Sequence, residues 1–579
     1  MSLFEPLESR LCLSAESGLR ADFYNSAGEV FSNSTIAVQT TPSQTETVPN
    51  VSFSASDLPA ATEIRFSGQI IAPESGSFCF HVITADAVRL WVNNQEIIDN
   101  WTPSSSSVNN AGIPIALAAN ASYDIRLDIS ETGAAASSIK LRWILPDATR
   151  QIVPASQLYP FSQPYSITTG GLYVGSWEST DNTVTALCVA TAQPVTIEDS
   201  TIRASGLLIA NTVPNVQLSV INNTGEGLNP NIAGALKGDF LYVQSVANLL
   251  VENNTIIGVG GYGIHVYTFT GSGDQTIKIL SNTIRNSDGR FSNGDGGYED
   301  SGVMTHSIAL QNIYGVPGMQ IAWNQIINAP YVSYVNDVIN LFEVSGTPSS
   351  PMEVDNNFIR GLYSLDVSGA YDSGSGITTD GSDDPAVASA FINIYDNQVI
   401  NTGSAGIGVP AGHNIQVFGN TLLSTGYIAG GVPVFASGTG VYINDLANAG
   451  PTEFYDNAAY DNVSGWIDPP DTQQNGGPTA QQRDYEFDNT EGATLSDNAD
   501  WPTPITSAAK AQQFALWQSM LEESGMTIGV VPDSQSTYSA PPAAVANPAP
   551  SVDAAAAVDS LDGITSLLLF PPNSDLLAA

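Results

Sequence analysis

Four side chains of types that transfer protons fall within one stretch of the chain: His306, Asp337, Asp380 and His413. A histidine can shuttle a proton, and an aspartate can act as an acid or as a base. Hydrolysis of a glycosidic bond with inversion uses two carboxyl groups roughly 6.5–9.5 Å apart, one protonated and one that activates water. These four residues are therefore the catalytic candidates for cleavage of a glycan.

Six five-residue segments align as equivalent β-strands, at 263–267, 302–306, 338–342, 376–380, 406–410 and 440–444. Their second and fourth residues are mostly aliphatic and should point inward, so the third and fifth should point outward. Stacked strands lie about 4.8 Å apart, which would place His306 and Asp380 two strands and roughly 10 Å apart. The other outward-pointing side chains could bind a polysaccharide, or they could belong to an ordinary protein surface. The substrate-binding candidates among them are His265, Tyr267, Asn340, Phe342, Thr378, Tyr442 and Asn444.

Acidic residues are concentrated in two loops beside these strands. Carboxylate oxygens are suitable ligands for calcium, although acidic loops are also found simply solvated. The sequence is therefore compatible with no cofactor or with bound calcium, and the calcium candidates are Asp295, Glu299, Asp300, Asp383 and Asp384.

An asparagine recurs between apolar residues in seven segments, such as VENNTII (251–257) and IYDNQVI (394–400). Its spacings are 28, 42, 33, 40, 23 and 37 residues, and 23 residues suit one coil of a parallel β-helix with loops inserted into longer coils. A turn asparagine tolerates left-handed backbone angles and can bond to its stacked neighbour. Over 166–468 the pattern resembles the right-handed parallel β-helix of the pectate-lyase-like superfamily, which implies a fold and no particular reaction. The repeating asparagines are Asn254, Asn282, Asn324, Asn357, Asn397, Asn420 and Asn457.

Residues 16–160 alternate apolar and polar residues in short segments, which predicts a β-sandwich or barrel. The blocks GLRADFYN (18–25), FSGQIIAPESGSFCFHVITADAVRLWVNNQEIIDNW (66–101) and VPASQLYP (153–160) resemble the PA14 domain. That resemblance implies a glycan-binding module, in which two adjacent aspartates hold calcium in the sugar-binding members. Asp86 matches the second aspartate but Ala85 replaces the first, so we expect Asp86 to close a turn and Trp91 and Trp101 to pack in the sandwich.

The two ends of the chain differ from its middle. Residues 1–15 contain FEPLESRLCLSA, which resembles the LEPR-type N-terminal motif of large bacterial surface and secreted proteins. Composition predicts a linker over 469–504, a helix over 505–526 that caps the open end of the β-helix, and a Pro/Ala-rich flexible tail over 527–579. The overall fold class is all-β with this short helical and flexible C-terminal region.

The charge of the chain narrows its partners. Of 579 residues, 16 are Lys or Arg and 57 are Asp or Glu, giving a formal net charge of −41. Nucleic acid and anionic membrane surfaces would be repelled, and no apolar run is long enough to span a bilayer. A lyase acting on a polyanion would need bound calcium for the same reason, which favours a hydrolase, whereas the superfamily resemblance favours a lyase.

Together these features predict an extracellular or cell-surface bacterial protein directed at a polysaccharide or cell-surface glycan. The leading hypothesis is an enzyme that cleaves the glycan in a β-helix groove by hydrolysis or lyase chemistry. The alternative is a non-catalytic adhesin whose β-helix is a stiff support for the PA14-like module. Converging histidine and carboxylate groups would favour the enzyme.

Overall fold

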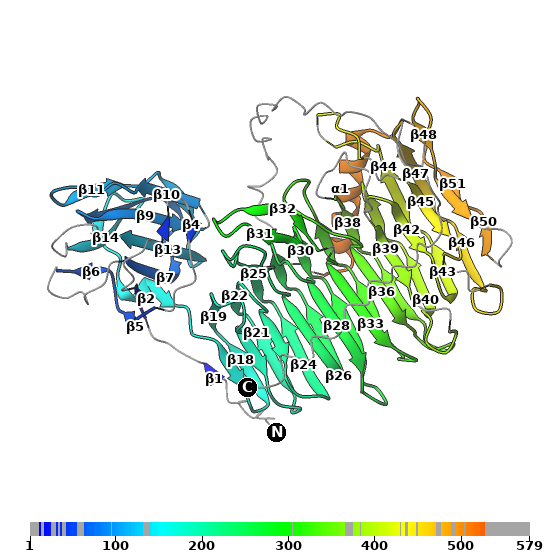
Figure 1. Ribbon diagram of the computed structural model, residues 1–579, viewed down its shortest axis with the longest axis horizontal. Helices are drawn as coiled ribbons and strands as arrows, with labels where there is room; N and C mark the ends of the chain where they lie inside the picture. Colours follow the sequence, from blue (N-terminus) through cyan, green and yellow to red (C-terminus); the bar gives the residue numbers. More distant parts are fainter. Residues whose placement is uncertain are drawn as a thin grey trace, which may run out of the picture. The chain divides into compact units, whose positions relative to one another are not determined.

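A computed structural model shows an almost entirely β protein (Figure 1). It describes residues 11–528 apart from 13–16, 25–30, 33–34, 37–41, 55–62, 94, 131–137, 304, 365–373, 382–383, 429, 435–437, 447–449, 471–475, 488–492, 503 and 527. Most of the N-terminal motif, Asp383 and nearly all of the 527–579 tail therefore lie outside the described residues. In the described part, no helix is long and apolar enough to cross a membrane.

The N-terminal domain contains two antiparallel sheets. Alternation of apolar and polar residues directs one face of each sheet into a shared core that includes Phe66, Phe80 and Trp143. The first sheet contains β10 (Gln95–Asn100), β9 (Ala87–Val92), β13 (Ser122–Ser130), β7 (Glu63–Ile71), β2 (Leu19–Tyr24), β5 (Gln44–Val48) and β16 (Leu158–Pro160). The second contains β11 (Val108–Ala111), β8 (Gly76–Thr84), β14 (Ile139–Ile144), β15 (Arg150–Ile152), β12 (Ile115–Leu117) and β6 (Ser52–Phe53).

The loop that resembles a calcium site forms a small turn. The Thr84 hydroxyl donates to Asp86 Oδ2 at 2.9 Å, and the Asp86 N–H donates to the Thr84 hydroxyl at 3.1 Å. The two tryptophans lie outside the main core, which corrects the expectation that they pack inside the sandwich. Trp91 alternates with the inward Leu90 and Val92, so its ring faces away from the core and lies 3.8 Å from the Arg126 guanidinium carbon. Trp101 packs against Tyr24 instead.

Beyond this domain, parallel strands repeat in three rows that form the faces of a β-helix (Figure 1). The first face contains β17 (Tyr165–Ile167), β20 (Leu187–Val189), β23 (Ile209–Asn211), β26 (Leu241–Glu252), β28 (Ile264–Phe269), β33 (Ile308–Ile313), β36 (Ile339–Val344), β39 (Ser375–Asp380), β42 (Ala405–Val409), β45 (Thr439–Ile443) and β49 (Tyr485–Phe487). The long strand β26 also enters the second face.

The second face contains β1 (Leu11–Cys12), β18 (Gly171–Val174), β21 (Val195–Glu198), β24 (Val216–Ile221), β29 (Ile277–Leu280), β34 (Gln320–Ala322), β37 (Met352–Asp355), β40 (Ala390–Tyr395), β43 (His413–Phe418), β46 (Asn457–Tyr460) and β50 (Ala493–Ser496). The third face contains β19 (Ser176–Ser179), β22 (Thr201–Ala204), β25 (Thr224–Gly227), β27 (Thr255–Ile257), β30 (Thr283–Arg285), β35 (Gln325–Ile327), β38 (Phe358–Arg360), β41 (Gln398–Ile400), β44 (Thr421–Ser424), β47 (Val463–Asp468), β48 (Gln481–Gln482) and β51 (Ala499–Asp500). Three short pieces lie outside these rows: the hairpins β3 (Phe31–Ser32) with β4 (Thr35–Ile36) and β31 (Arg290–Ser292) with β32 (Tyr298–Gly302), and a 3₁₀ turn at Ala155–Gln157.

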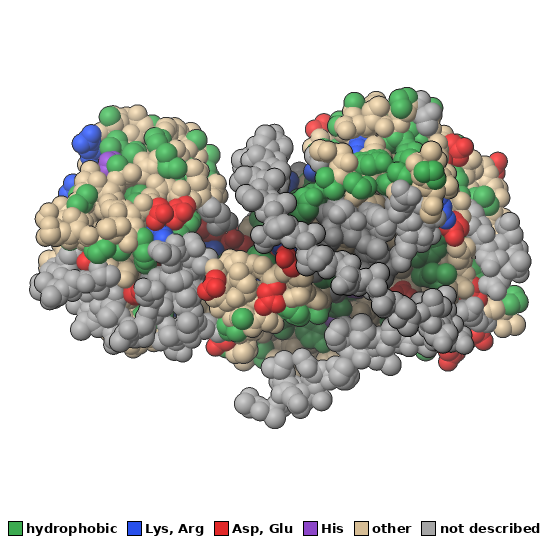
Figure 2. Space-filling view, turned by 45° about the horizontal axis from the view of Figure 1, so that its top comes forward, with side chains coloured by type: hydrophobic (Ala, Val, Ile, Leu, Met, Phe, Trp, Pro, Cys, Tyr) green, Lys and Arg blue, Asp and Glu red, His purple; other side chains and the backbone are tan. Residues whose placement is uncertain are grey.

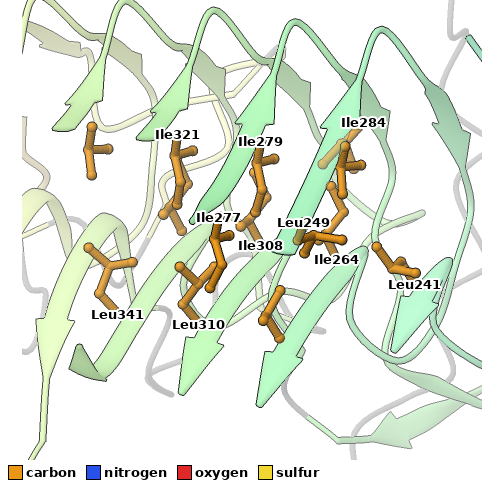
Figure 3. Close-up of a cluster of buried hydrophobic side chains, with 14 of the residues drawn as sticks. Leu241, Leu249, Ile264, Ile277, Ile279, Ile284, Ile308, Leu310, Ile321 and Leu341 are labelled. Carbon is orange, nitrogen blue, oxygen red and sulfur yellow. The ribbon is translucent and has the colours of Figure 1, made fainter. Parts of the chain in front are cut away.

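Identical aliphatic positions stack from coil to coil inside the β-helix. Leu241, Ile264, Ile308 and Ile339 follow one another in register on the first face, and all four are fully buried. Figure 3 shows Leu241, Ile264 and Ile308 of this column among other Ile and Leu side chains inside the β-helix. Because a one-residue slip would turn every inward side chain outward, these columns determine the register of each coil.

A continuous asparagine ladder follows the corner between the second and third faces. From Asn254 onward, each ladder asparagine accepts, at its side-chain oxygen, both the backbone N–H and the side-chain amide of the preceding one. Asn282, for example, donates to Asn324 Oδ1 at 3.0 Å by both groups. The Asn324 amide in turn donates to the Ile279 carbonyl and to Asn357 Oδ1. The ladder runs through Asn223, Asn254, Asn282, Asn324, Asn357, Asn397, Asn420, Asn462 and Asn498.

The residue before each ladder asparagine has a left-handed backbone conformation. It is an asparagine, aspartate, serine or glycine at eight of the nine turns, and Trp323, at φ +59°, is the exception. A non-glycine residue in this region costs roughly 1–3 kcal/mol, which the saturated ladder must offset. The ladder therefore explains why the corner tolerates an unfavourable residue such as Trp323.

Asn457 is not part of the ladder, which corrects that assignment. The sequence Tyr-Asp-Asn occurs twice in tandem, at 455–457 and 460–462, and the second copy occupies the corner. Asn457 begins β46 instead and accepts the Ile415 N–H. The expected linker over 469–504 also contains strands: β49, β50 and β51 add part of a further coil, β48 pairs antiparallel with β47, and Asn498 extends the ladder into the added coil.

One of the six aligned segments is also misplaced. The strand that pairs with β28 is β33, so Ala309 lies opposite His265. Met304, the third residue of the aligned segment 302–306, is outside the described residues. His306 lies two residues before β33. The other five segments pair in the expected register, as in the contacts of Asn340 with Thr378 and of Gly408 with Tyr442.

The helix α1 (Ser507–Glu523) begins at Thr506, whose side chain accepts the Ala509 N–H. It does not cap the end of the β-helix as expected but packs along its third face. Trp517 is fully buried against Phe358 and donates its indole N–H to the Asn356 carbonyl at 2.7 Å. This helix therefore covers a row of outward-facing apolar side chains on the third face and not the open last coil.

Replacing an internal ladder residue should destabilise the β-helix more than replacing the terminal one. Asn324→Ala leaves the buried N–H of Asn282 without its acceptor and should lower the free energy of unfolding by about 3 kcal/mol, because each buried unsatisfied group costs about 1–3 kcal/mol. Asn498→Ala, at a partly exposed position, should cost about 1 kcal/mol because water replaces the lost partner. Urea unfolding followed by circular dichroism measures both, and equal losses would contradict the role of the ladder.

Candidate active site

The outward side chains of the first face lie in columns, because its strands stack in register. One column lies two residues before the inward-pointing Leu241, Ile264, Ile308 and Ile339, in four successive coils. It contains Asp239, Tyr262, His306 and Asp337. Two further columns follow on the outer surface of the strands. One contains Tyr242, His265, Ala309, Asn340, Thr378, Gly408 and Tyr442, and the other contains Gln244, Tyr267, Gln311, Phe342 and Asp380.

Asp337 is the most extensively hydrogen-bonded carboxylate of this surface. Its Oδ1 accepts the Thr378 hydroxyl at 2.7 Å and the Ser375 N–H at 2.8 Å. Its Oδ2 accepts the Asn340 amide at 3.0 Å. Asn340 and Thr378, expected to contact substrate, are buried and instead hold this carboxylate.

His306 lies against Asp337. Its Nδ1 is 3.1 Å from the Asp337 carbonyl oxygen and 3.7 Å from Asp337 Oδ2. The ring stacks on Tyr262, with centroids 5.1 Å apart. Burial lowers the pKa of His306 below its ordinary value, against the opposing effect of the Asp337 charge. The imidazole is therefore favoured in its neutral form, in which one ring nitrogen can accept a proton.

Asp380 occupies the neighbouring outward column, one coil beyond Phe342. Burial, together with the negative charge of Asp337, raises the pKa of Asp380 to about 6. The Gly381 N–H, which donates to Asp380 Oδ1 at 2.8 Å, opposes this shift. Asp380 thus retains a proton in mildly acidic water, as a general acid must.

A second histidine extends this cluster toward the N-terminal coils. His265 Nδ1 lies 3.5 Å from Asp239 Oδ2, and His265 Nε2 lies 3.3 Å from Gln311 Oε1. Its ring meets Tyr262 edge-on, with centroids 4.3 Å apart, and Tyr242 at 5.0 Å. These aromatic and polar side chains form a surface that suits the faces and hydroxyls of sugar rings.

Tyr442 reaches the site from the C-terminal side. Its ring lies directly across Gly408 in the preceding coil, where any added Cβ would be 2.5 Å from the ring carbon Cζ. Burial, with the nearby charge of Asp337, raises the pKa of the Tyr442 hydroxyl, so it remains a neutral donor. Of the other substrate-binding candidates, Tyr267 and Phe342 are half-buried on the same surface, and the Asn444 amide lies 3.4 Å from Glu486 Oε1.

His413 belongs to the second face, as the first residue of β43. Its ring stacks on Tyr455 at 4.6 Å and meets Phe391 edge-on at 5.6 Å. His413 Nδ1 lies 2.9 Å from Asn414 Oδ1. The structure therefore brings three of the four catalytic candidates together on the first face and places His413 in an aromatic stack on another.

The acidic loops do not converge into a metal site in the part of the chain that the structure describes, where no three His, Cys, Asp or Glu side chains are grouped for a metal ion. Asp295 and Asp300 are exposed on the β31–β32 hairpin, and Glu299 accepts the Ser301 hydroxyl at 2.8 Å. Asp384 accepts the Ala386 N–H at 3.0 Å.

Basic residues near this surface are paired with an aspartate. Lys237, two residues before Asp239, lies 3.3 Å from Asp288, and Arg290 lies 2.7 Å from the same carboxylate. On the face drawn in Figure 2, acidic side chains are scattered among polar and hydrophobic ones, and basic side chains are few. The pairing of Lys237 and Arg290 with Asp288 favours an uncharged ligand over a polyanion.

Sequence reasoning missed three side chains of the cluster, Asp239, Tyr262 and Glu343. The first two share the column of His306 and Asp337, two residues before the strands, which an alignment of the strands alone leaves out. Glu343 follows the fifth residue of its aligned segment, at a left-handed position. Tyr262 and Glu343 adjoin aligned segments, which is the signal that could have found them, whereas Asp239 precedes a strand outside the alignment.

Comparison with known proteins identifies the N-terminal domain. Residues 15–157 match the family model of the PA14 domain, which confirms the resemblance seen in the sequence. Anti-sigma-I factor RsgI3 of Acetivibrio thermocellus is 35% identical over 101 residues, which are 17% of this chain and 15% of that protein. The chain therefore spans less than a sixth of the length of this curated relative.

Two matching solved structures each cover 25% of this chain. An anti-sigma factor domain-containing protein is 27% identical, with a TM-score of 0.22, over 25% of this chain and 48% of that one. A PA14 sugar-binding domain from an RTX adhesin is 13% identical, with a TM-score of 0.22, over 25% of this chain and 99% of that one.

Replacing Asp380 should stabilise the protein at neutral pH. A carboxyl whose folded-state pKa is raised to about 6 from 3.8 stabilises the fold below about pH 4 and loses that contribution as the pH rises through 6. Asp380→Asn removes the charge, so it should raise the free energy of unfolding at pH 7, relative to wild type, by about 2–3 kcal/mol more than at pH 4. Urea unfolding at both pH values measures this, and an equal effect at the two pH values would refute it.

Proposed function

We propose that this protein is an extracellular, polysaccharide-directed enzyme that cleaves its glycan by hydrolysis on the first face of the β-helix. The observation that carries the proposal is the convergence on one surface of His306, Asp337 and Asp380, which lie up to 74 positions apart in the sequence. Neighbouring coils place these groups within a few strand spacings of about 4.8 Å each.

The protonation states support acid–base chemistry. Asp380, with its raised pKa, can donate a proton to the leaving glycosidic oxygen. The neutral His306 can accept or relay a proton beside Asp337. Lyase chemistry on a uronic acid polymer is less well supported, because the nearby Lys237 and Arg290 charges are already paired with Asp288.

The PA14 domain would serve the same substrate. PA14 domains are carbohydrate-binding modules of glycosidases and adhesins, so we assign to residues 15–157 the task of holding the polymer near the β-helix. The same association, together with the N-terminal motif, supports a location outside a bacterial cell. Asp86 accepts the Thr84 hydroxyl, and Ala85 has no carboxylate. We therefore do not expect this domain to bind sugar through a calcium ion held by two adjacent aspartates.

A non-catalytic adhesin is the second candidate. The observation that favours it is the internal use of Asn340 and Thr378, whose polar groups hold Asp337 rather than facing outward. In that case the β-helix would support the PA14 domain and the His306 cluster would contribute to stability alone.

The test is release of reducing ends from a panel of neutral and uronic polysaccharides, with absorbance near 235 nm followed in parallel and calcium present or absent. We expect reducing ends without absorbance, and a loss of at least about 100-fold in Asp380→Asn, because general acid catalysis contributes 10²–10⁴-fold. The matched control is Asp396→Asn, an exposed left-handed turn residue on another corner, which should leave the rate unchanged.

Other results would replace this proposal. A rise in absorbance would establish a lyase. Binding of a glycan without any cleavage across the panel would establish the adhesin.

A further inference from the structure

The two carboxyl groups that hydrolysis requires must both be free to act on a sugar or on water. Asp337 does not meet this condition, because Thr378, Ser375 and Asn340 occupy both of its oxygens. It is also buried, with 5% of its surface exposed. Asp337 is thus suited to holding His306 and to setting the charge around Asp380. The partner of Asp380 must be another residue.

Glu343 lies directly beside Asp380. Phe342 pairs with Asp380 across neighbouring coils, and Glu343 is the next residue. Its left-handed backbone, with φ +56°, interrupts the strand alternation and belongs to a series of such residues at the same position in successive coils, including Thr268 and Asn312. The half-buried Glu343 side chain therefore leaves the strand on its outer side.

A glycine brings the two carboxyl groups together. The Glu343 side chain passes over Gly381, where an added Cβ would lie 3.0 Å from Glu343 Cγ. The N–H of the same glycine donates to Asp380 Oδ1 at 2.8 Å. Gly381 thus fixes one carboxyl by a hydrogen bond and leaves room for the stem of the other.

Tyr314 orients the Glu343 carboxylate. The Tyr314 hydroxyl lies 2.9 Å from Glu343 Oε2 and 3.1 Å from Asn312 Oδ1. Tyr314 is 41% exposed, so this end of the pair is open to water and to a ligand. Unlike Asp337, Glu343 has a carboxylate at the surface beside an exposed aromatic ring.

We propose that Glu343 is the second catalytic carboxylate, which activates the attacking water while Asp380 acts as the acid, and that Asp337 is a positioning residue for His306. The assignment rests on the proposed hydrolysis. In the reaction, the carboxyl proton of Asp380 passes to the glycosidic oxygen as the bond from that oxygen to the anomeric carbon breaks. Glu343 takes a proton from water, whose oxygen bonds to the same carbon. One water is consumed, and each fragment leaves with a complete hydroxyl group.

The test is chemical rescue of Glu343→Ala by sodium azide, with a polysaccharide that the wild-type protein cleaves in the panel above. We expect a loss of at least 100-fold, and recovery of at least 10-fold on addition of azide, which attacks the anomeric carbon in place of the activated water. Mass spectrometry should find a glycosyl azide. Asp337→Ala should lose activity without azide rescue, and Tyr314→Phe should retain part of the rate.

Glu343→Gln, which keeps the size of the side chain, should also lose activity while its circular dichroism matches wild type. An active Glu343→Gln, or a Glu343→Ala that azide does not rescue, overturns the Glu343 assignment and leaves hydrolysis intact if Asp380→Asn is inactive. A wild-type protein that cleaves no polymer in the panel overturns both the assignment and the proposed function.

Discussion

The asparagine ladder is the constraint on which the β-helix depends. Backbone groups at the corner of a coil have no strand partner, and burying them unpaired would cost about 1–3 kcal/mol each. Each ladder asparagine from Asn254 onward satisfies two donors of the preceding turn, and the amide of Asn324, for example, also donates to a strand carbonyl and to the next asparagine. Coils as short as 23 residues and as long as 42 therefore share one corner geometry, and their extra residues are confined to loops elsewhere.

Because the corner has the same geometry in every coil, side chains at equivalent positions of successive coils stack in columns. These columns bring the residues of the candidate site together. Tyr262, His306 and Asp337 come from three successive coils, yet their rings and carboxylate are in contact because the strands that follow them stack in register. The same rigidity holds Asp380 in surroundings that raise its pKa, with burial and the Asp337 charge both acting against ionisation. This arrangement lowers the free energy of unfolding at neutral pH, and such perturbed pKa values are typical of sites that carry out acid–base chemistry.

The sequence predicted the fold class because its signals are local and repeated: an asparagine between apolar residues, and alternating strands in the PA14 domain. It failed where one local pattern fitted two places. The tandem Tyr-Asp-Asn placed Asn457 rather than Asn462 at the corner, and the segment 302–306 resembled a strand although β33 begins at Ile308. His306 lies against Asp337 as expected, but it does so from a position two residues before β33. Asn340 and Thr378 were identified as outward, yet only side-chain geometry shows that they bind Asp337, and the position of Glu343 depends on a left-handed residue that no alternation rule predicts.

The central claim is that a glycan is bound and cleaved on the first face of the β-helix. A crystal structure of Asp380→Asn with an oligosaccharide from a cleaved polymer tests it most directly. We expect a glycosidic oxygen within hydrogen-bonding distance of the residue 380 side chain, with the anomeric carbon facing Glu343 and sugar rings against Tyr262 and His265. An oligosaccharide found only on the PA14 domain, with the first face empty, would contradict it.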